Sequence, residues 1–178
     1  MRAALFASLL VTLPLQAFAA GSDSSEPPKP TETTLKCEEG RIYDEKTKAC
    51  VVPDKTGLND DTRFDAVREL AHAGRPEEAL IVLAAMTEGD TDRVLTYKGF
   101  ANRKAGRLEA GLKYYAQALA QNPGNILARS YLGQAYVEMD EMVLAAAELT
   151  EIRARGGAGT WADAALATAI ETGVTYSY

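Results

Sequence analysis

The chain of 178 residues has little of what enzymes use: one histidine, His72, and only two cysteines. A single imidazole cannot supply base and nucleophile pairs, and no His, Cys and Asp residues stand at metal-site spacing. The glycine-rich run 156–160 lacks the preceding strand and the lysine of phosphate-binding loops. The sequence therefore predicts a protein that is not an enzyme and that needs neither a cofactor nor a metal ion.

An excess of basic residues is also missing. Lysine and arginine total 19 against 25 aspartate and glutamate, which gives a formal net charge of −6. A net acidic chain without a basic stripe does not suit the phosphate backbone of nucleic acids. Beyond the first 20 residues, no run is long and apolar enough to span a bilayer. We expect no nucleic-acid partner and no transmembrane segment in the mature chain.

The N-terminus has the pattern of an export signal. Met1 and Arg2 precede an apolar run over residues 3–18, and Ala17-Phe18-Ala19 forms the small-x-small motif of a cleavage site. A membrane helix is disfavoured because the apolar core is short and a polar stretch follows directly. The prediction is a cleaved signal peptide over residues 1–19 and a periplasmic location.

The two cysteines, Cys37 and Cys50, stand close together in the sequence. In an exported chain, an even pair at short spacing indicates one disulfide bond. A zinc site would need four soft ligands, and the chain offers only these two thiols and the distant His72. The disulfide is therefore the prediction.

Between the predicted signal peptide and residue 60, the chain divides into two short segments. Residues 20–36 contain three prolines among Ser, Thr and Glu, which predicts a disordered linker. Residues 37–59 hold two β-prone runs around a turn-like Asp44–Thr47, which predicts a disulfide-clamped hairpin. Such a module is too small to fold alone, so we expect it to cap the helical region.

From residue 60 onward the pattern is helical and repetitive. Gly99 and Gly133 stand 34 positions apart, a period typical of stacked helix–turn–helix units. We expect an all-α superhelix of three hairpins over residues 60–91, 92–125 and 126–159. A capping helix over residues 160–173 and a tail over residues 174–178 follow, because the last unit of a solenoid needs a cap.

Residues 60–159 resemble three tetratricopeptide repeats. The second unit matches that family at Gly99, Gly106, Tyr115, Ala118, Leu119 and Pro123, and the third at Leu132, Gly133, Tyr136 and Ala145. The first matches only at Gly74, Ala79 and Leu83, and the third has Asp140 at its turn. The resemblance implies a right-handed superhelix and a binding function. The whole layout is similar to small periplasmic tetratricopeptide proteins of Gram-negative bacteria.

The resemblance also implies where a partner binds. The family lines its groove with set positions of each first helix, which here are Phe64, Arg68, Arg93, Tyr97, Phe100, Arg103, Lys104, Tyr131 and Gln134. Aromatic side chains beside arginine suit an extended acidic or C-terminal peptide. The alternative is that the tyrosines belong to the core and the cations are only solvated. His72, just before Gly74, is expected at a helix C-terminus.

Three functions remain open. The preferred one is a non-catalytic adaptor that binds another envelope protein or a peptide segment during envelope assembly or secretion. The second is a glycan-, peptidoglycan- or small-ligand-binding module that uses the Cys37–Cys50 hairpin. Over 14 residues this hairpin is similar to the one that ends some chitin-binding domains, at Cys37, Gly40, Tyr43 and Cys50. The third is self-association, for example through the aromatic tail.

Overall fold

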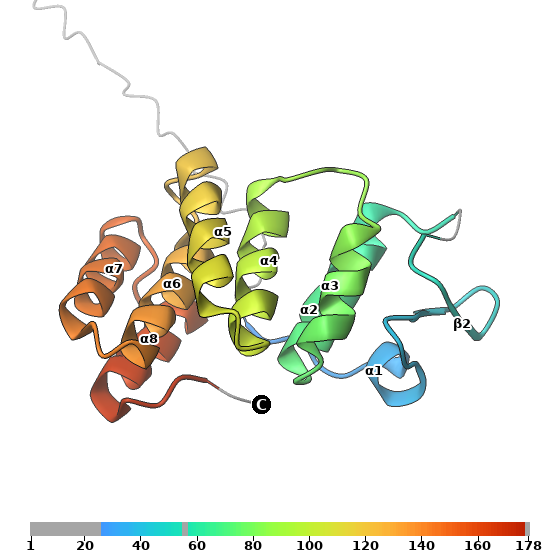
Figure 1. The fold of residues 1–178 in the computed structure, drawn as a ribbon, viewed down its shortest axis with the longest axis horizontal. Helices are drawn as coiled ribbons and strands as arrows, with labels where there is room; N and C mark the ends of the chain where they lie inside the picture. The colour runs from blue at the N-terminus through green and yellow to red at the C-terminus, as the bar shows by residue number, and fades with distance from the viewer. Residues whose placement is uncertain (1–25, 55–56, 177–178) are drawn as a thin grey trace, which may run out of the picture.

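The structure, a computed structural model, describes residues 26–54 and 57–176 (Figure 1). The predicted signal peptide over residues 1–19 lies outside this part of the chain. The elements in order are α1 Glu32–Lys36, β1 Ile42–Asp44, β2 Ala49–Val51, α2 Asp60–His72, α3 Pro76–Ala84, α4 Asp92–Lys104, α5 Leu108–Gln121, α6 Ile126–Glu138, α7 Met142–Ala154 and α8 Trp161–Thr172. The predicted all-α fold with a small hairpin is confirmed. In the described part, no helix combines the length and apolarity needed to cross a membrane.

The helices stack as hairpins. Each first helix packs on the helix that follows it, so α2 pairs with α3, α4 with α5, and α6 with α7. Further contacts join α2 to α4, α4 to α6 and α6 to α8. We call α2, α4, α6 and α8 the inner row, and their solvent-facing side the inner surface. The second helices α3, α5 and α7 form the outer row (Figure 1).

Helix ends follow the sequence signals. The side chain of Asn59 accepts a hydrogen bond from the Thr62 amide at 2.8 Å, and Asn125 caps α6 in the same way. Between the two helices of the second hairpin, Gly106 takes a left-handed conformation with φ 79°. Asp140 does so at the third turn, with φ 61°. Aspartate tolerates this region better than most residues, so departure from the family's glycine leaves the turn intact.

The two glycines at the 34-residue period mark close approaches between helices. A Cβ on Gly99 would lie 2.5 Å from the ring of Tyr115, which α5 contributes. A Cβ on Gly133 would lie 2.5 Å from the side chain of Leu166, which α8 contributes. The same period relates Leu132 to Leu166, so α8 is the first helix of an incomplete fourth unit. This register explains why α8 packs on α6 as α6 packs on α4.

The N-terminal module is clamped as predicted. Cys37 and Cys50 form a disulfide with their Cα atoms 5.6 Å apart, and β1 and β2 pair antiparallel. Ile42 is buried in the main hydrophobic cluster of the helices. Glu78 of α3 accepts a hydrogen bond from the Gly40 amide at 2.7 Å. The module therefore packs against the first hairpin of the solenoid.

The segment before this module differs from the expected disordered linker. Residues 32–36 form helix α1, whose N-terminus lies against the buried carboxylate of Glu69 on α2. Glu69 accepts hydrogen bonds from the amides of Thr31 at 2.7 Å and Thr34 at 3.0 Å, and from both threonine hydroxyls at 2.6 Å. Thr31 is the local N-cap of α1, but composition alone did not reveal the helix, because the carboxylate that anchors it is distant in sequence.

Candidate functional site

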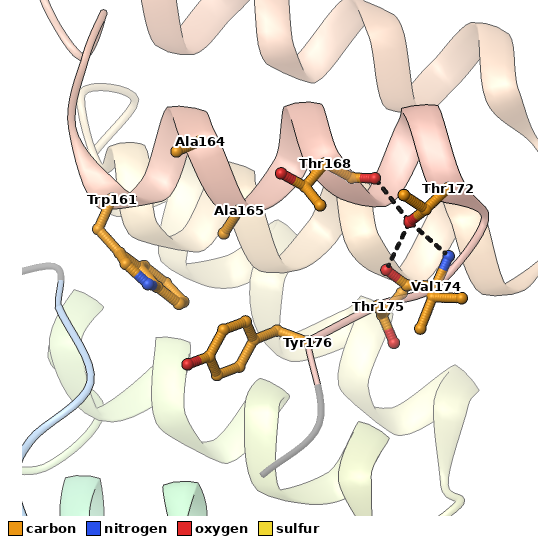
Figure 2. A pocket seen from close by; sticks show the side chains of 8 residues that line it. All are labelled: Trp161, Ala164, Ala165, Thr168, Thr172, Val174, Thr175 and Tyr176. Carbon is orange, nitrogen blue, oxygen red and sulfur yellow. Dashed lines mark hydrogen bonds between the residues drawn. The ribbon is translucent and has the colours of Figure 1, made fainter.

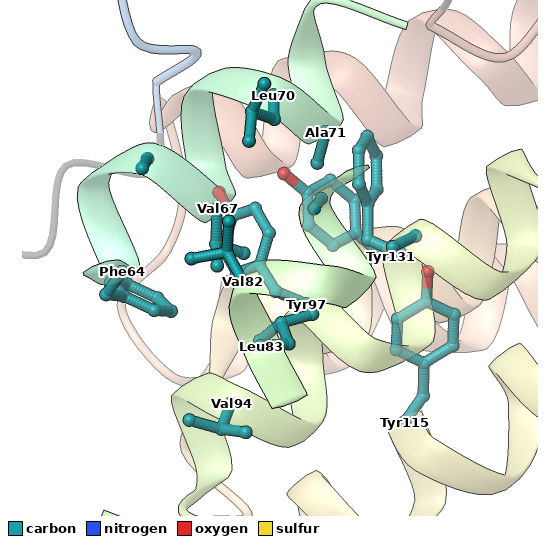
Figure 3. Packing of buried hydrophobic residues seen from close by; sticks show 14 of the residues in the cluster. Phe64, Val67, Leu70, Ala71, Val82, Leu83, Val94, Tyr97, Tyr115 and Tyr131 are labelled. Atoms are coloured by element: carbon teal, nitrogen blue, oxygen red, sulfur yellow. The ribbon is translucent and has the colours of Figure 1, made fainter. Parts of the chain in front are cut away.

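Aromatic side chains run along the inner row. Phe64 on α2 meets Tyr97 on α4 at 5.3 Å between ring centroids (Figure 3). Phe100 meets Tyr131 on α6 at 4.4 Å. Trp161 on α8 extends the line, 6.3 Å from Tyr131. Tyr131 is completely buried, and Tyr97 and Phe100 are each 2% exposed. Tyr97, Phe100 and Tyr131 are therefore buried beneath the inner surface and are not free to contact a partner. For the two tyrosines, this is the core position that the alternative interpretation predicted.

His72 joins this cluster. Its Nε2 lies 3.1 Å from the hydroxyl of Tyr131 and 3.3 Å from that of Tyr97, and its ring stacks on Phe100 at 4.9 Å. Burial, with smaller contributions from Arg68 and Lys104, lowers the pKa of His72 to about 3. The residue does end α2, but it is a neutral core histidine rather than a cation that interacts with the helix dipole.

Three of the predicted groove residues already form hydrogen bonds or ion pairs with other residues of the chain. Arg103 is buried and donates from Nη1 to Oε1 of Glu138 at 2.6 Å. Gln134 is buried and donates to the Ser130 hydroxyl at 3.3 Å. Arg93 pairs with Glu88 and with Asp61, each at 2.9 Å, while its guanidinium covers the Phe64 ring.

Two cations of the predicted set hold other parts of the chain. Arg68 donates from Nη2 to the main-chain carbonyl of Glu26 at 2.9 Å. Lys104 donates to the main-chain carbonyl of Tyr176. Burial is the main cause that lowers the pKa of Lys104, to about 8. Glu26 and Tyr176 therefore both lie on the inner surface, each attached through its backbone carbonyl.

The C-terminal segment makes two further contacts there (Figure 2). After Gly173 it turns back along the ends of the helices, and the Tyr176 ring meets Trp161 edge-on at 5.5 Å. Thr175 donates its hydroxyl to Oε1 of Glu138 at 2.6 Å, the same oxygen that Arg103 approaches. An open pocket of about 420 Å³ lies between this segment and α8.

The structure brings Phe64, Tyr97, Phe100 and Tyr131 together in one packed line, with Arg68 and Lys104 at its solvent side. The predicted groove residues did not include Trp161. The repeat contained a signal for it, because the 34-residue step from Arg93 to Leu127 leads next to Trp161. Tyr176 lies outside the repeats and has no such signal. Among the described residues, no group of three His, Cys, Asp or Glu side chains could hold a metal ion.

The fold defines a helical-repeat protein. Residues 102–169 match the sequence model of the tetratricopeptide repeat family, and this match and the helical fold together support assignment to that family. The matched range ends inside α8, in agreement with the fourth-unit register of that helix. No curated protein and no solved structure matches the chain significantly. Tetratricopeptide repeats generally mediate protein–protein interactions and are typically non-catalytic scaffolds.

Proposed function

We propose that this protein is a non-catalytic adaptor whose inner surface binds a segment of a partner protein. One observation carries the proposal: Arg68 and Lys104 each donate to a main-chain carbonyl of an irregular segment that crosses this surface. Every peptide carries such carbonyls. The same donors are therefore suited to a partner's backbone.

Charge and aromatic character support the same surface. Arg68 and Lys104 lie along it in a chain of net charge −6, while the buried Arg103 pairs with Glu138 beneath them. Cations beside a partly exposed aromatic side chain, here Trp161, suit an extended segment better than a compact domain. Phe64, Tyr97, Phe100, Tyr131 and Gln134 would support the site from beneath, with Arg93 and Arg103 held in their ion pairs.

The partner we propose is an envelope protein. The disulfide between Cys37 and Cys50 is compatible with an extracytoplasmic location, since such bonds persist in oxidising compartments. Together with the predicted signal peptide, it favours export to the periplasm and a role in envelope assembly or secretion.

The alternative, glycan binding by the hairpin, has less support. The hairpin's main aromatic side chain is Tyr43, and the ammonium of Lys36 lies over its ring at 5.4 Å. A sugar that stacks on this face would have to displace the lysine. The hairpin's contacts with Arg75 and Glu78 instead fit a structural cap.

Affinity capture from periplasmic extract tests the proposal. The parent chain is compared with a variant that carries Arg68→Gln and Lys104→Gln. A matched control carries Lys46→Gln and Lys113→Gln, two exposed lysines away from the inner surface. We expect one partner to be retained by the parent and the control but lost from the first variant. Equal retention by all three proteins, or none by any, would contradict the proposal.

A further inference from the structure

The chain's own C-terminal segment occupies a small site at the end of the inner surface. Three groups from different helices form this site: Lys104 of α4, Glu138 of α6 and Trp161 of α8. Each contacts the segment in a different way. Lys104 binds the Tyr176 carbonyl, Glu138 accepts the Thr175 hydroxyl, and Trp161 packs against the Tyr176 ring.

We propose, on the basis of the function above, that this site binds extended peptide segments with a hydroxyl residue followed by an aromatic residue. Thr175 and Tyr176 are its resident occupant and compete with such a segment. The three contacts fix the order of the two residues and the direction of the backbone. None of them depends on the covalent link through Gly173, so a segment from another molecule satisfies the same groups.

The resident segment uses the site incompletely. Tyr176 remains 42% exposed and Val174 67% exposed, although both lie against α8. The pocket of about 420 Å³ beside them is lined by α8 side chains, among them Ala164, Ala165 and Thr168 (Figure 2). A partner peptide has room there for an apolar side chain next to its hydroxyl and aromatic pair.

Polarity at the site selects against an acidic residue at the hydroxyl position. Glu138 already accepts from Arg103, and its Oε1 receives the Thr175 hydroxyl as a second donor. A carboxylate in place of that hydroxyl would face Glu138 with like charge. A serine or threonine therefore fits this position. The sequence analysis expected an acidic or C-terminal peptide, and the site excludes an acidic residue at this one position of the peptide.

Competition by the attached segment has a measurable consequence. A tethered occupant acts at a high effective concentration, and the apparent affinity for a free peptide falls by the fraction of sites that remain open. If the tail fills about nine sites in ten, weakening it raises the affinity for a free peptide roughly tenfold.

The test uses the full chain and a labelled synthetic peptide with the sequence of residues 172–176. Its binding is compared between the parent and Tyr176→Ala, which weakens the resident occupant. Trp161 is the only tryptophan in the chain, so its emission reports directly on the site. A control peptide replaces the threonine by valine and the tyrosine by alanine.

We expect the peptide to bind Tyr176→Ala roughly tenfold more tightly than the parent and to restore the parental Trp161 emission. Adding Lys104→Gln to Tyr176→Ala should weaken binding about tenfold, because a charge-assisted hydrogen bond is lost. Lys113→Gln in the same background should leave it unchanged. Equal binding to parent and Tyr176→Ala, no binding to either, or no effect of Lys104→Gln would overturn the proposal.

A peptide library selected on the Tyr176→Ala chain separates this proposal from the adaptor function. Selected peptides that bind regardless of Lys104→Gln would leave the adaptor function in place and overturn the proposed site. If the probe peptide binds as expected but the library yields no binder, the site stands and the adaptor function fails.

Discussion

Between pH 7 and pH 5, acid should destabilise this protein mainly through one residue, His72. In the unfolded chain its pKa is near 6.5, and in the folded protein burial lowers it to about 3. Because the folded pKa is the lower one, the contribution of His72 is fully present above pH 6.5 and is lost as the pH falls toward 3. The slope in this range is about 1.4 kcal/mol per pH unit, so lowering the pH from 7 to 5 should remove about 2 kcal/mol of unfolding free energy.

The pH window isolates this histidine. The pKa values of Asp60, Glu78 and Asp163 are also lowered in the folded state, mainly by hydrogen bonds that outweigh the opposing effect of burial. Their reference values of 3.8 and 4.5 place their effect mostly below pH 5. The pKa of Lys104, about 8, lies above the window. Between pH 7 and 5, the only histidine of the chain should dominate.

Urea denaturation at pH 7, 6 and 5 measures the effect on the parent and on His72→Gln. Glutamine keeps a donor and an acceptor for the two tyrosine hydroxyls but cannot titrate in this range. We expect it to be less stable at pH 7 and to show almost no change down to pH 5. A parent whose stability is flat between pH 7 and 5, or a variant with the parental slope, would refute the reasoning.

Four further predictions concern packing, the disulfide, the N-terminal segment and the tail. Gly99→Ala should cost about 1–3 kcal/mol in urea denaturation, because its Cβ would overlap the Tyr115 ring. Gly124→Ala should cost much less, because its Cβ would meet only the exposed Asn122 side chain; equal effects would contradict this. Replacing both cysteines, Cys37→Ser with Cys50→Ser, should remove about 3 kcal/mol of loop-closure stabilisation. Amide hydrogen exchange should become faster in β1 and β2, while α5 and α6 keep their protection. An equal loss of protection in both regions would count against a local clamp. Glu69→Ala should release α1 and speed tryptic cleavage after Lys36, while the exposed Glu109→Ala should not; unchanged cleavage would show that Glu69 is not the anchor. Raising the pH from 7 to 9 should discharge Lys104, weaken its bond to the Tyr176 carbonyl and shift Trp161 emission, a change absent from Lys104→Gln; a shift of equal size in that variant would rule out Lys104 as its source.

The repeated elements of the fold were predictable from sequence because their signals are local or periodic. Proline at the start of α3, asparagine before α6 and the left-handed Gly106 mark helix ends without reference to distant residues. The 34-residue step located Gly99 and Gly133 and implied close helix approach. The structure shows that Gly99 lets α4 approach Tyr115 of its own hairpin, whereas Gly133 lets α6 approach Leu166 of the following unit.

The sequence did not reveal features that depend on contacts between residues far apart in the chain. Helix α1 depends on Glu69, about 35 residues away, and no local pattern announces such a cap. The groove positions were assigned by analogy with the family, and they fall on α2, α4 and α6. The analogy carries no information on what covers them, and Tyr176 and Glu26 lie outside the repeats. Solvent exposure of Tyr97 and Tyr131 therefore could not be decided from their spacing.

Both described ends of the chain, Glu26 and Tyr176, lie on the inner surface. A purification tag or surface linker fused directly before Glu26 or directly after Tyr176 would therefore begin on the face proposed to bind partners, and it would crowd that face. The hairpin turn around Lys46 is exposed and belongs to the disulfide-clamped module, which packs against the first hairpin of the solenoid. An attachment point there would leave the inner surface open, so interaction screens on this protein should label it at that turn.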